Sequence, residues 1–115
     1  YSVTLQIATS VQIGDQKFSV DVAKKGPSMV FSDGNILKSF TVGAGHSTLV
    51  DGKEVSINTG SEMEVNYDGS AYIISVVEIA NPISMDVHKG SKVKTVDLKA
   101  GKRLIIEGGK VVKVK

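Results

Sequence analysis

The chain has 115 residues, enough to bury a core without cross-links, and its 41% apolar and 23% charged residues are typical of a globular protein. It contains no cysteine, which excludes disulfides and thiolate zinc sites, and no apolar run long enough for a transmembrane helix. We expect a single all-β domain over residues 1–115. The chain begins at Tyr1, so this residue is expected to be a processed terminus or the start of an excised domain.

Turn signals recur along the whole chain at spacings of about 8–12 residues, which is typical of all-β sandwiches and barrels. Many of them are glycine next to aspartate, and glycine supplies the positive φ that tight hairpin turns require. The clearest signals are Gly14-Asp15, Asp33-Gly34, Asp51-Gly52, Asp68-Gly69, Lys89-Gly90 and Gly108-Gly109.

Between these turns, apolar and polar residues alternate with a period of two, which predicts half-buried strands. In chain order, the alternating segments are Val3 to Ile7, Phe18 to Val22, Phe40 to Val42, Val55 to Ile57, Met63 to Tyr67 and Ile83 to Val87. Two apolar segments, Leu104 to Ile106 and Val111 to Val114, flank the Gly108-Gly109 turn and predict a final hairpin. No segment has the spacing and capping residues of a long helix.

The longest apolar run extends from Ala71 to Ala80 and follows Met63 to Tyr67 across the Asp68-Gly69 turn. This arrangement predicts a hairpin whose second strand lies in the middle of the fold and is covered on both faces. Glu78 interrupts the run, so its carboxylate must be hydrogen-bonded, paired with a cation or located at the wet end of the strand. A position of Glu78 at the solvent-exposed end of the strand is the simplest of these interpretations.

These patterns predict an antiparallel β-sandwich of about 10–12 short strands, of the jelly-roll or Greek-key kind, with a β-barrel as the alternative. Connections of this length are too short for crossovers between parallel strands. Pairing every second turn gives units of about 17–21 residues, within the range of some β-solenoids. The units share no side-chain pattern beyond strand-turn-strand, which favours hairpins of similar length over a repeat protein.

Neither histidine belongs to a recognisable metal motif. His46 follows the glycine-rich loop Gly43-Ala44-Gly45, and His88 ends a predicted strand, so we expect both to be solvated surface groups. The glycine-rich loop completes neither the dinucleotide fingerprint nor the P-loop, which excludes a nucleotide site as the main interpretation. No serine lies in a Gly-X-Ser-X-Gly elbow, although a Ser-His-Asp triad around either histidine could assemble in space.

The carboxylates also have simple structural interpretations. Glu62 and Glu64 lie on the same face of one predicted strand, where they form its polar side rather than the two arms of a glycosidase cleft. Asp33, Asp51 and Asp68 each precede a glycine, a preferred type I′ turn sequence, and none belongs to a calcium-binding loop. We expect no metal site and no cofactor.

The charge distribution is the most distinctive feature. Residues 1–88 carry ten acids and five lysines, whereas residues 89–115 carry eight lysines, Arg103 and two acids. The basic residues alternate with valines, which predicts a lysine-rich sheet face. The candidate binding residues on this face are Lys92, Lys94, Lys102, Arg103, Lys110 and Lys113.

Three interpretations of this basic face compete. It binds an anionic partner such as an acidic polysaccharide, it docks on an acidic neighbouring copy or subunit, or its lysines protect an exposed sheet edge from aggregation. Nucleic acid is a poor candidate because only one arginine is present and all six aromatic residues precede the basic segment. With no tryptophan, a sugar-stacking platform is also disfavoured.

The stretch from Leu49 to Ser61 resembles the Asp-Gly repeats of FecR-type periplasmic signalling domains, over about a tenth of the chain. Any antiparallel pair of hairpins produces the same pattern, so we assign no family from it.

We therefore expect a non-enzymatic structural or interaction domain of a larger surface, secreted or viral assembly, of bacterial, archaeal or viral origin, that acts through protein-protein contacts. A binding module for an acidic glycan or another polyanion is the alternative, with the basic face as its site. An enzyme with a site around His46 ranks third.

Overall fold

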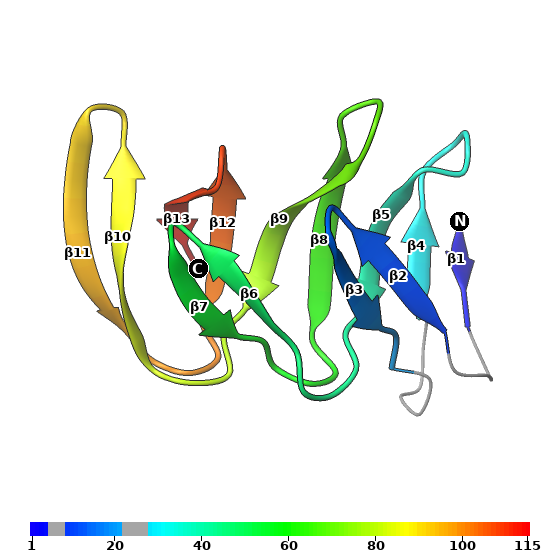
Figure 1. Cartoon of the computed structure of the whole chain (residues 1–115), viewed down its shortest axis with the longest axis horizontal. Coiled ribbons are helices and arrows are strands. Elements are labelled where there is room, and N and C mark those ends of the chain that lie inside the picture. Colours follow the sequence, from blue (N-terminus) through cyan, green and yellow to red (C-terminus); the bar gives the residue numbers. More distant parts are fainter. Residues whose placement is uncertain (5–8, 22–27) are drawn as a thin grey trace.

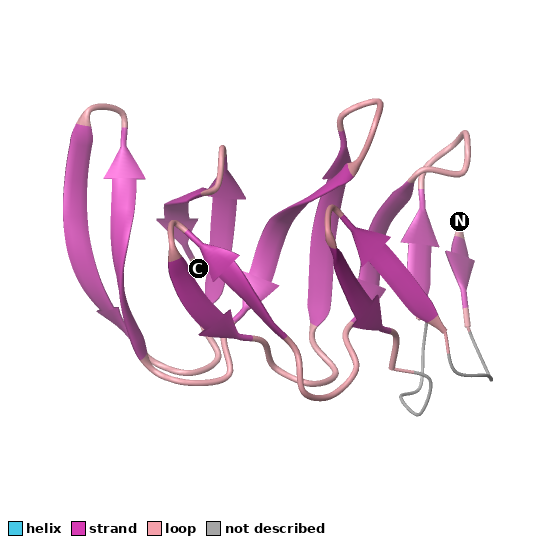
Figure 2. Cartoon of the chain, viewed as in Figure 1, coloured by secondary structure: helices cyan, strands magenta, loops and turns pink. Residues whose placement is uncertain are grey.

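The computed structural model describes residues 1–4, 9–21 and 28–115. This part of the chain is all-β and contains no helix (Figure 2). Its strands are β1 Ser2–Val3, β2 Ser10–Ile13, β3 Gln16–Ser19, β4 Met29–Phe31, β5 Leu37–Thr41, β6 Ser47–Val50, β7 Lys53–Ser56, β8 Glu62–Tyr67, β9 Tyr72–Glu78, β10 Ile83–Lys89, β11 Lys92–Leu98, β12 Arg103–Glu107 and β13 Lys110–Val114. The predicted all-β class is confirmed. Of the predicted strand segments, residues 5–7 and Val22 lie outside the described residues.

Nine strands form one large sheet in the order β1-β4-β5-β8-β9-β12-β13-β10-β11. The hairpins β2–β3 and β6–β7 form two small sheets that lie across one face of the large sheet (Figure 1). This layered arrangement is compatible with the predicted sandwich. The barrel alternative is wrong because the large sheet does not close: its end strands are β1 and β11.

Among the residues that the structure describes, the strand pairings are antiparallel with one exception, which makes the large sheet mixed. Strand β10 runs parallel to β13, and the two meet at a single pair, Val87 and Val111. A β10–β11 hairpin of seven-residue strands thereby extends the sheet beyond β13. The antiparallel prediction holds for the hairpins, whose short turns permit no other direction.

The structure contains an internal repeat that the side-chain pattern did not reveal. An isolated bridge joins Val20 to Val42, and a second bridge joins Ile57 to Ile79, so both partners recur 37 positions later. Hairpin β6–β7 likewise begins 37 residues after β2–β3, at Ser47 instead of Ser10. We therefore divide the chain into three units, each made of two consecutive hairpins, the second of which lies in the large sheet.

The first unit spans residues 10–42, the second 47–79 and the third 83–115. The first hairpins of the three units are β2–β3, β6–β7 and β10–β11. We call β2–β3 and β6–β7 the cover hairpins, whereas β10–β11 is part of the large sheet. The second hairpins, which we call the sheet hairpins, are β4–β5, β8–β9 and β12–β13. The trial units of 17–21 residues that the turn spacing suggested are about half of this 37-residue spacing.

Consecutive units are joined by the same backbone hydrogen bonds. The amide of Val42 donates to the carbonyl of Ser61 at 2.9 Å, and the amide of Ile79 donates to the carbonyl of Lys102 at 2.9 Å. A return bond completes each junction, from Gly60 to Val42 at 2.7 Å and from Gly101 to Ile79 at 2.9 Å. The sheet therefore continues from unit to unit with one geometry.

The core lies between the large sheet and the cover hairpins, and equivalent positions of the three units supply it. Ile13, Val50 and Val87, each 37 residues apart, are all buried. Val42 and Ile79, the residues at the two junctions, are completely buried. Burial of branched apolar side chains at matching positions is what the period-two alternation requires of strands that face a common core.

Strand β9 corresponds to the long apolar run and lies in the middle of the sheet, as predicted. Its two faces are not both covered, however, because the Ile73 side chain is 50% exposed. Glu78 accepts a hydrogen bond from Asn58 Nδ2 at 2.9 Å and lies 3.8 Å from Arg103 Nη1. The carboxylate is thus hydrogen-bonded and paired with a cation while remaining partly exposed.

The turn of the β8–β9 hairpin is held by Asp68. Its Oδ1 accepts hydrogen bonds from the amides of Ala71 and Ser70 and from the Ser70 hydroxyl, each at 2.9 Å. These donors, the Ala71 amide first, lower the pKa of the Asp68 carboxyl below its ordinary value of 3.8. Because the folded-state pKa is lowered, the charged turn stabilises the fold above that ordinary value, and the contribution is lost as the pH falls through the lowered pKa.

We expect the buried side chains at the unit junctions to dominate stability. Leu104 on β12 is completely buried opposite Val77 of β9, so Leu104→Ala should destabilise the protein by about 2–5 kcal/mol. Leu49→Ala provides a matched control because Leu49 is 73% exposed, and it should change stability by less than about 0.5 kcal/mol. Urea unfolding followed by circular dichroism measures both. Equal effects of the two substitutions would contradict the proposed core.

Candidate functional site

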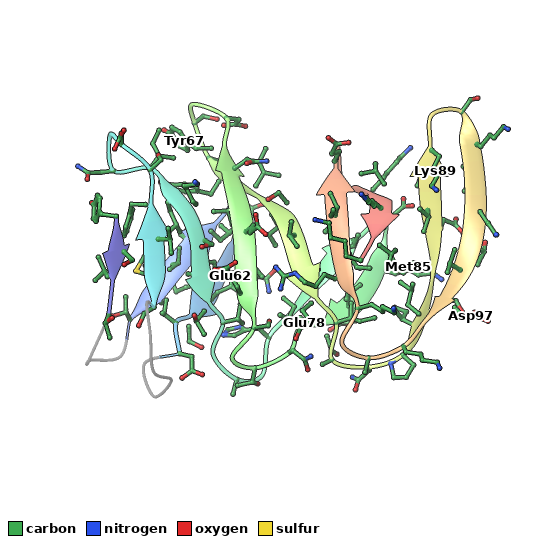
Figure 3. All side chains as sticks on the ribbon, turned by 180° about the vertical axis from the view of Figure 1, so that it is seen from behind. Glu62, Tyr67, Glu78, Met85, Lys89 and Asp97 are labelled. Atoms are coloured by element: carbon green, nitrogen blue, oxygen red, sulfur yellow. The ribbon has the colours of Figure 1, made fainter. Side chains whose placement is uncertain are left out.

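The basic C-terminal segment forms an open groove between hairpin β10–β11 and strand β13. Its volume is about 710 Å³. We call it the lysine groove and define it by the residues that line it, which are four lysines and four valines: Lys89, Lys92, Lys94, Lys113, Val87, Val93, Val96 and Val114. Lys89 lies on β10 beside the hairpin turn, at the far end of the strand from Asp97 on β11 (Figure 3).

The register of the hairpin explains why the lysines gather. Lys89 is paired directly with Lys92, and Lys94 is paired with Val87. Because alternate residues of a strand share a face, Lys92, Lys94 and Val96 all project from one side of β11. Like charges placed directly opposite each other destabilise a hairpin. An anion bound in the groove would relieve this repulsion.

The opposite face of the same hairpin has a different character. Asp86 on this face accepts a hydrogen bond from the Thr95 hydroxyl at 2.7 Å, and Asp97 is hydrogen-bonded to the Ser84 hydroxyl. The hairpin therefore carries its acids on one face and its lysines on the other. In the described part of the chain, none of the four groove lysines forms an ion pair with a carboxylate.

The six predicted binding residues do not form one face. Lys92, Lys94 and Lys113 line the groove, whereas Lys110 begins β13 opposite Glu107 and Lys102 is exposed before β12. The prediction missed Lys89. A two-residue turn at Gly90-Ser91 places Lys89 directly opposite Lys92, so this pairing could have been predicted from the sequence.

Arg103 has a different role from the lysines because it links the second unit to the third. Its Nη2 donates to the Glu62 carbonyl at 3.1 Å and lies 3.6 Å from the Glu64 carboxylate, and its Nη1 lies 3.8 Å from Glu78. Glu62 and Glu78 both lie on the side of the sheet seen in Figure 3. Arg103 thus pairs with acids of its own chain.

His46 is a structural residue and not the solvated group that we expected. Its Nε2 accepts a hydrogen bond from the Ser19 amide at 2.9 Å and lies 2.8 Å from the Ser19 hydroxyl, and its ring packs 5.2 Å from that of Phe18. Gly43 packs so closely that a Cβ there would lie 2.2 Å from the Ser19 Oγ. The Ser19-His46 pair therefore fastens the first cover hairpin to the loop after β5.

His88 is also partly buried, contrary to expectation, and its Nε2 lies 2.9 Å from the Asp51 carboxylate. Asp51 has a φ of 50° and Gly52 a φ of 78°, as the predicted type I′ turn requires. The pair joins the second cover hairpin to β10. Within the described ranges, no three His, Asp or Glu side chains gather in a cluster that could hold a metal ion.

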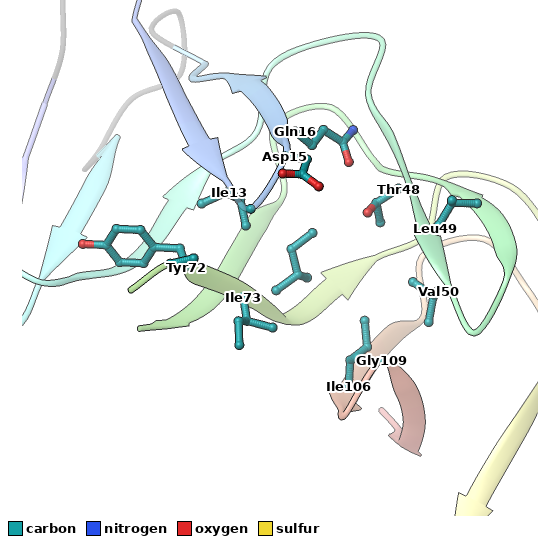
Figure 4. Close-up of a pocket in the computed structure, with 13 residues that line it drawn as sticks. Ile13, Asp15, Gln16, Thr48, Leu49, Val50, Tyr72, Ile73, Ile106 and Gly109 are labelled. Atoms are coloured by element: carbon teal, nitrogen blue, oxygen red, sulfur yellow. The ribbon is translucent and has the colours of Figure 1, made fainter. Parts of the chain in front are cut away.

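A second groove, of about 430 Å³, lies between the first two cover hairpins on the same face of the sheet (Figure 4). It is lined by the β2–β3 turn, strands β6 and β9, and residues Ile106 and Gly109 of the third unit. Most of its lining residues are apolar, and Asp15 is the acidic residue among them. It marks the gap left where successive cover hairpins cross the sheet.

No helix in the described part of the chain is long and apolar enough to cross a membrane. Comparison of the chain with protein-family models, curated proteins and solved structures gives no match.

We expect Arg103 to contribute modestly to the junction between the second and third units. Arg103→Ala should destabilise the protein by about 1 kcal/mol, because its ion pairs are partly exposed to solvent. The loss should shrink in 1 M NaCl, in which the Debye length is about 3 Å. Lys99→Ala in the exposed turn before β12 is the control. A loss that does not depend on salt would show that Arg103 acts through packing and not through charge.

Proposed function

We propose that the chain is a non-enzymatic structural or interaction domain that acts through protein-protein contacts within a larger surface, secreted or viral assembly. The observation that supports this proposal is the stacking of three similar units into one continuous sheet. Proteins built in this way present extended, rigid surfaces to their partners. The molecule is correspondingly elongated, with principal extents of 42 × 30 × 23 Å.

The distribution of charge among the units supports the same function. The second unit carries six acids and one lysine, the third carries nine basic residues and three acids, and the first is nearly balanced. Arg103 of the third unit pairs with two acids of the second unit and so neutralises part of their charge. The positive charges of the groove lysines, in contrast, remain exposed on the surface. When a positively charged surface of one protein faces a negatively charged surface of another, the complementary charges favour specific association.

Light scattering during gel filtration tests this proposal. We expect the average mass to exceed that of a monomer at high protein concentration, or a stable complex to form when candidate assembly proteins are added. High salt should weaken the association because the charges are exposed. A monomer at all concentrations and salt conditions, together with an empty cross-linking screen against candidate partners, would remove the basis of the proposal.

A second candidate function, binding of an acidic glycan or another polyanion, is favoured by one specific observation. Four lysines converge on one groove without carboxylate partners among the described residues. A cluster of this kind attracts polyanions and releases them as ionic strength rises.

Heparin chromatography distinguishes this candidate. If it is correct, a chain with the groove residues Lys89, Lys92, Lys94 and Lys113 changed to Glu should elute without retention. A control with the same change in net charge, at the exposed residues Lys17, Lys38, Lys99 and Lys102, should remain largely retained. Equal retention of the two variants would reject a polyanion site in the lysine groove.

A further inference from the structure

The two cover hairpins are joined by a reciprocal pair of side-chain contacts. From β3, the side-chain amide of Gln16 donates a hydrogen bond to the backbone carbonyl of Ser47 at the start of β6. In the opposite direction, His46, which precedes β6, accepts a hydrogen bond at its Nε2 from the backbone amide of Ser19 at the end of β3. Each side chain thus bonds a backbone group of the other hairpin. We call the two bonds together the hairpin clasp.

The clasp lies beside the groove between the two cover hairpins. Gln16 lines this groove from the β3 side, and Thr48 and Val50 line it from β6 (Figure 4). On the first cover hairpin, Phe18 is completely buried and Ile13 is nearly so. The clasp therefore holds in place a hairpin that covers part of the apolar core.

The His46 half of the clasp requires a neutral imidazole ring. A ring nitrogen accepts a hydrogen bond only while it carries no proton, so the neutral ring must hold its proton on Nδ1. A proton on Nε2 would place two N–H donors opposite each other across the 2.9 Å between Nε2 and the Ser19 amide nitrogen. The Ser19 hydroxyl, 2.8 Å from Nε2, can accept from a protonated ring, but the backbone amide would still face a donor. Protonation of His46 therefore breaks its bond with the Ser19 amide.

A positive charge on His46 would have no paired acid. Among the described residues, no carboxylate forms an ion pair with His46. The one carboxylate bonded to the neighbouring Ser47 hydroxyl, at 2.9 Å, is that of Glu54. The Phe18 ring, whose centroid lies 5.2 Å from that of His46, is uncharged. The charged residues on the two cover hairpins and directly after β3 are Asp15, Lys17, Asp21, Asp51, Lys53 and Glu54.

The other histidine makes a contact that acid does not break. His88 Nε2 lies 2.9 Å from the Asp51 carboxylate, at the turn of the second cover hairpin. A proton on this ring turns the contact into an ion pair. The second cover hairpin therefore keeps its contact with β10 when both histidines are protonated.

We propose that the hairpin clasp is a pH-sensitive switch. As the pH falls through the range in which histidine gains a proton, about pH 8 to 5, His46 releases the Ser19 amide and the first cover hairpin loosens from the second. The contribution of this bond is thus present while His46 is neutral and is lost in acid. The switch goes beyond the proposed function and does not depend on it, because the clasp lies within one chain.

Two NMR measurements on the folded chain test the switch. The nitrogen chemical shifts of the imidazole show which ring nitrogen carries the proton, and we expect Nδ1–H for His46 at about pH 8. Amide hydrogen exchange is then divided by the intrinsic exchange rate at each pH. The Ser19 amide should lose roughly fivefold to tenfold of its protection by about pH 5, the effect of one net hydrogen bond. The Asp51 amide, which donates to the Gly109 carbonyl at 2.9 Å, should keep its protection and serves as the internal control.

His46→Gln is the matched variant. Its side-chain oxygen can accept the Ser19 bond and does not titrate, so the loss of protection in acid should disappear. His88→Gln is the control, because it also removes one titrating ring, and the loss of protection at Ser19 should persist in it. Circular dichroism verifies that each variant folds, and the ring-nitrogen shifts of the wild-type chain test the switch without any substitution.

Three results would overturn the switch. The first is a proton on Nε2 of neutral His46, which would show that the ring donates at this position. The second is a Ser19 amide that keeps its protection while His46 gains its proton. The third is a His46→Gln variant that loses protection in acid as the wild type does. None of these results concerns association, which light scattering measures separately, so failure of the switch and failure of the proposed function are distinguishable.

Discussion

The fold depends on the backbone pairing that joins each unit to the next. A single sheet hairpin cannot bury enough apolar surface to be stable alone. At Val42 and again at Ile79, a pair of hydrogen bonds carries the sheet into the following unit, and both side chains are completely buried. Each junction therefore contributes hydrogen bonds and core together, and the cover hairpin closes the apolar face of the sheet. The stability of the molecule is shared among neighbouring units, as in other repeat architectures.

The same construction leaves the two ends of the molecule unlike each other. One end is the edge of β1, a strand of two residues, and the other is the long β10–β11 hairpin with its lysines. Exposed lysines discourage unspecific pairing at the edge strand β11, which agrees with the third interpretation of the basic face. Edge protection and specific binding are compatible here, because the lysines of β11 share one face and their acidic counterparts, Asp86 and Asp97, occupy the other.

Much of the fold could be predicted from local patterns, and the candidate site only in part. The alternation at Met63 to Tyr67 and the Asp68-Gly69 turn predicted the β8–β9 hairpin correctly. The repeat was not predictable in this way, because equivalent residues such as Phe18 and Val55 share burial but not identity. The basic segment was recognised, yet Arg103 was grouped with the lysines because its partners, Glu64 and Glu78, come from strands far away in the sequence.

The sequence by itself determined the all-β class, most of the strands and the positions of the turns. These depend on side-chain alternation and on glycine at positive φ, both of which are local properties. Only the tertiary structure decided the sheet order, the threefold repeat and the role of each charge. His46 shows the reason: it looked like an exposed loop residue, but Ser19, distant along the chain, supplies its hydrogen bonds. Lys92 and Lys94 likewise line a groove only because hairpin β10–β11 lies beside β13, and a groove is made by the packing of separate elements.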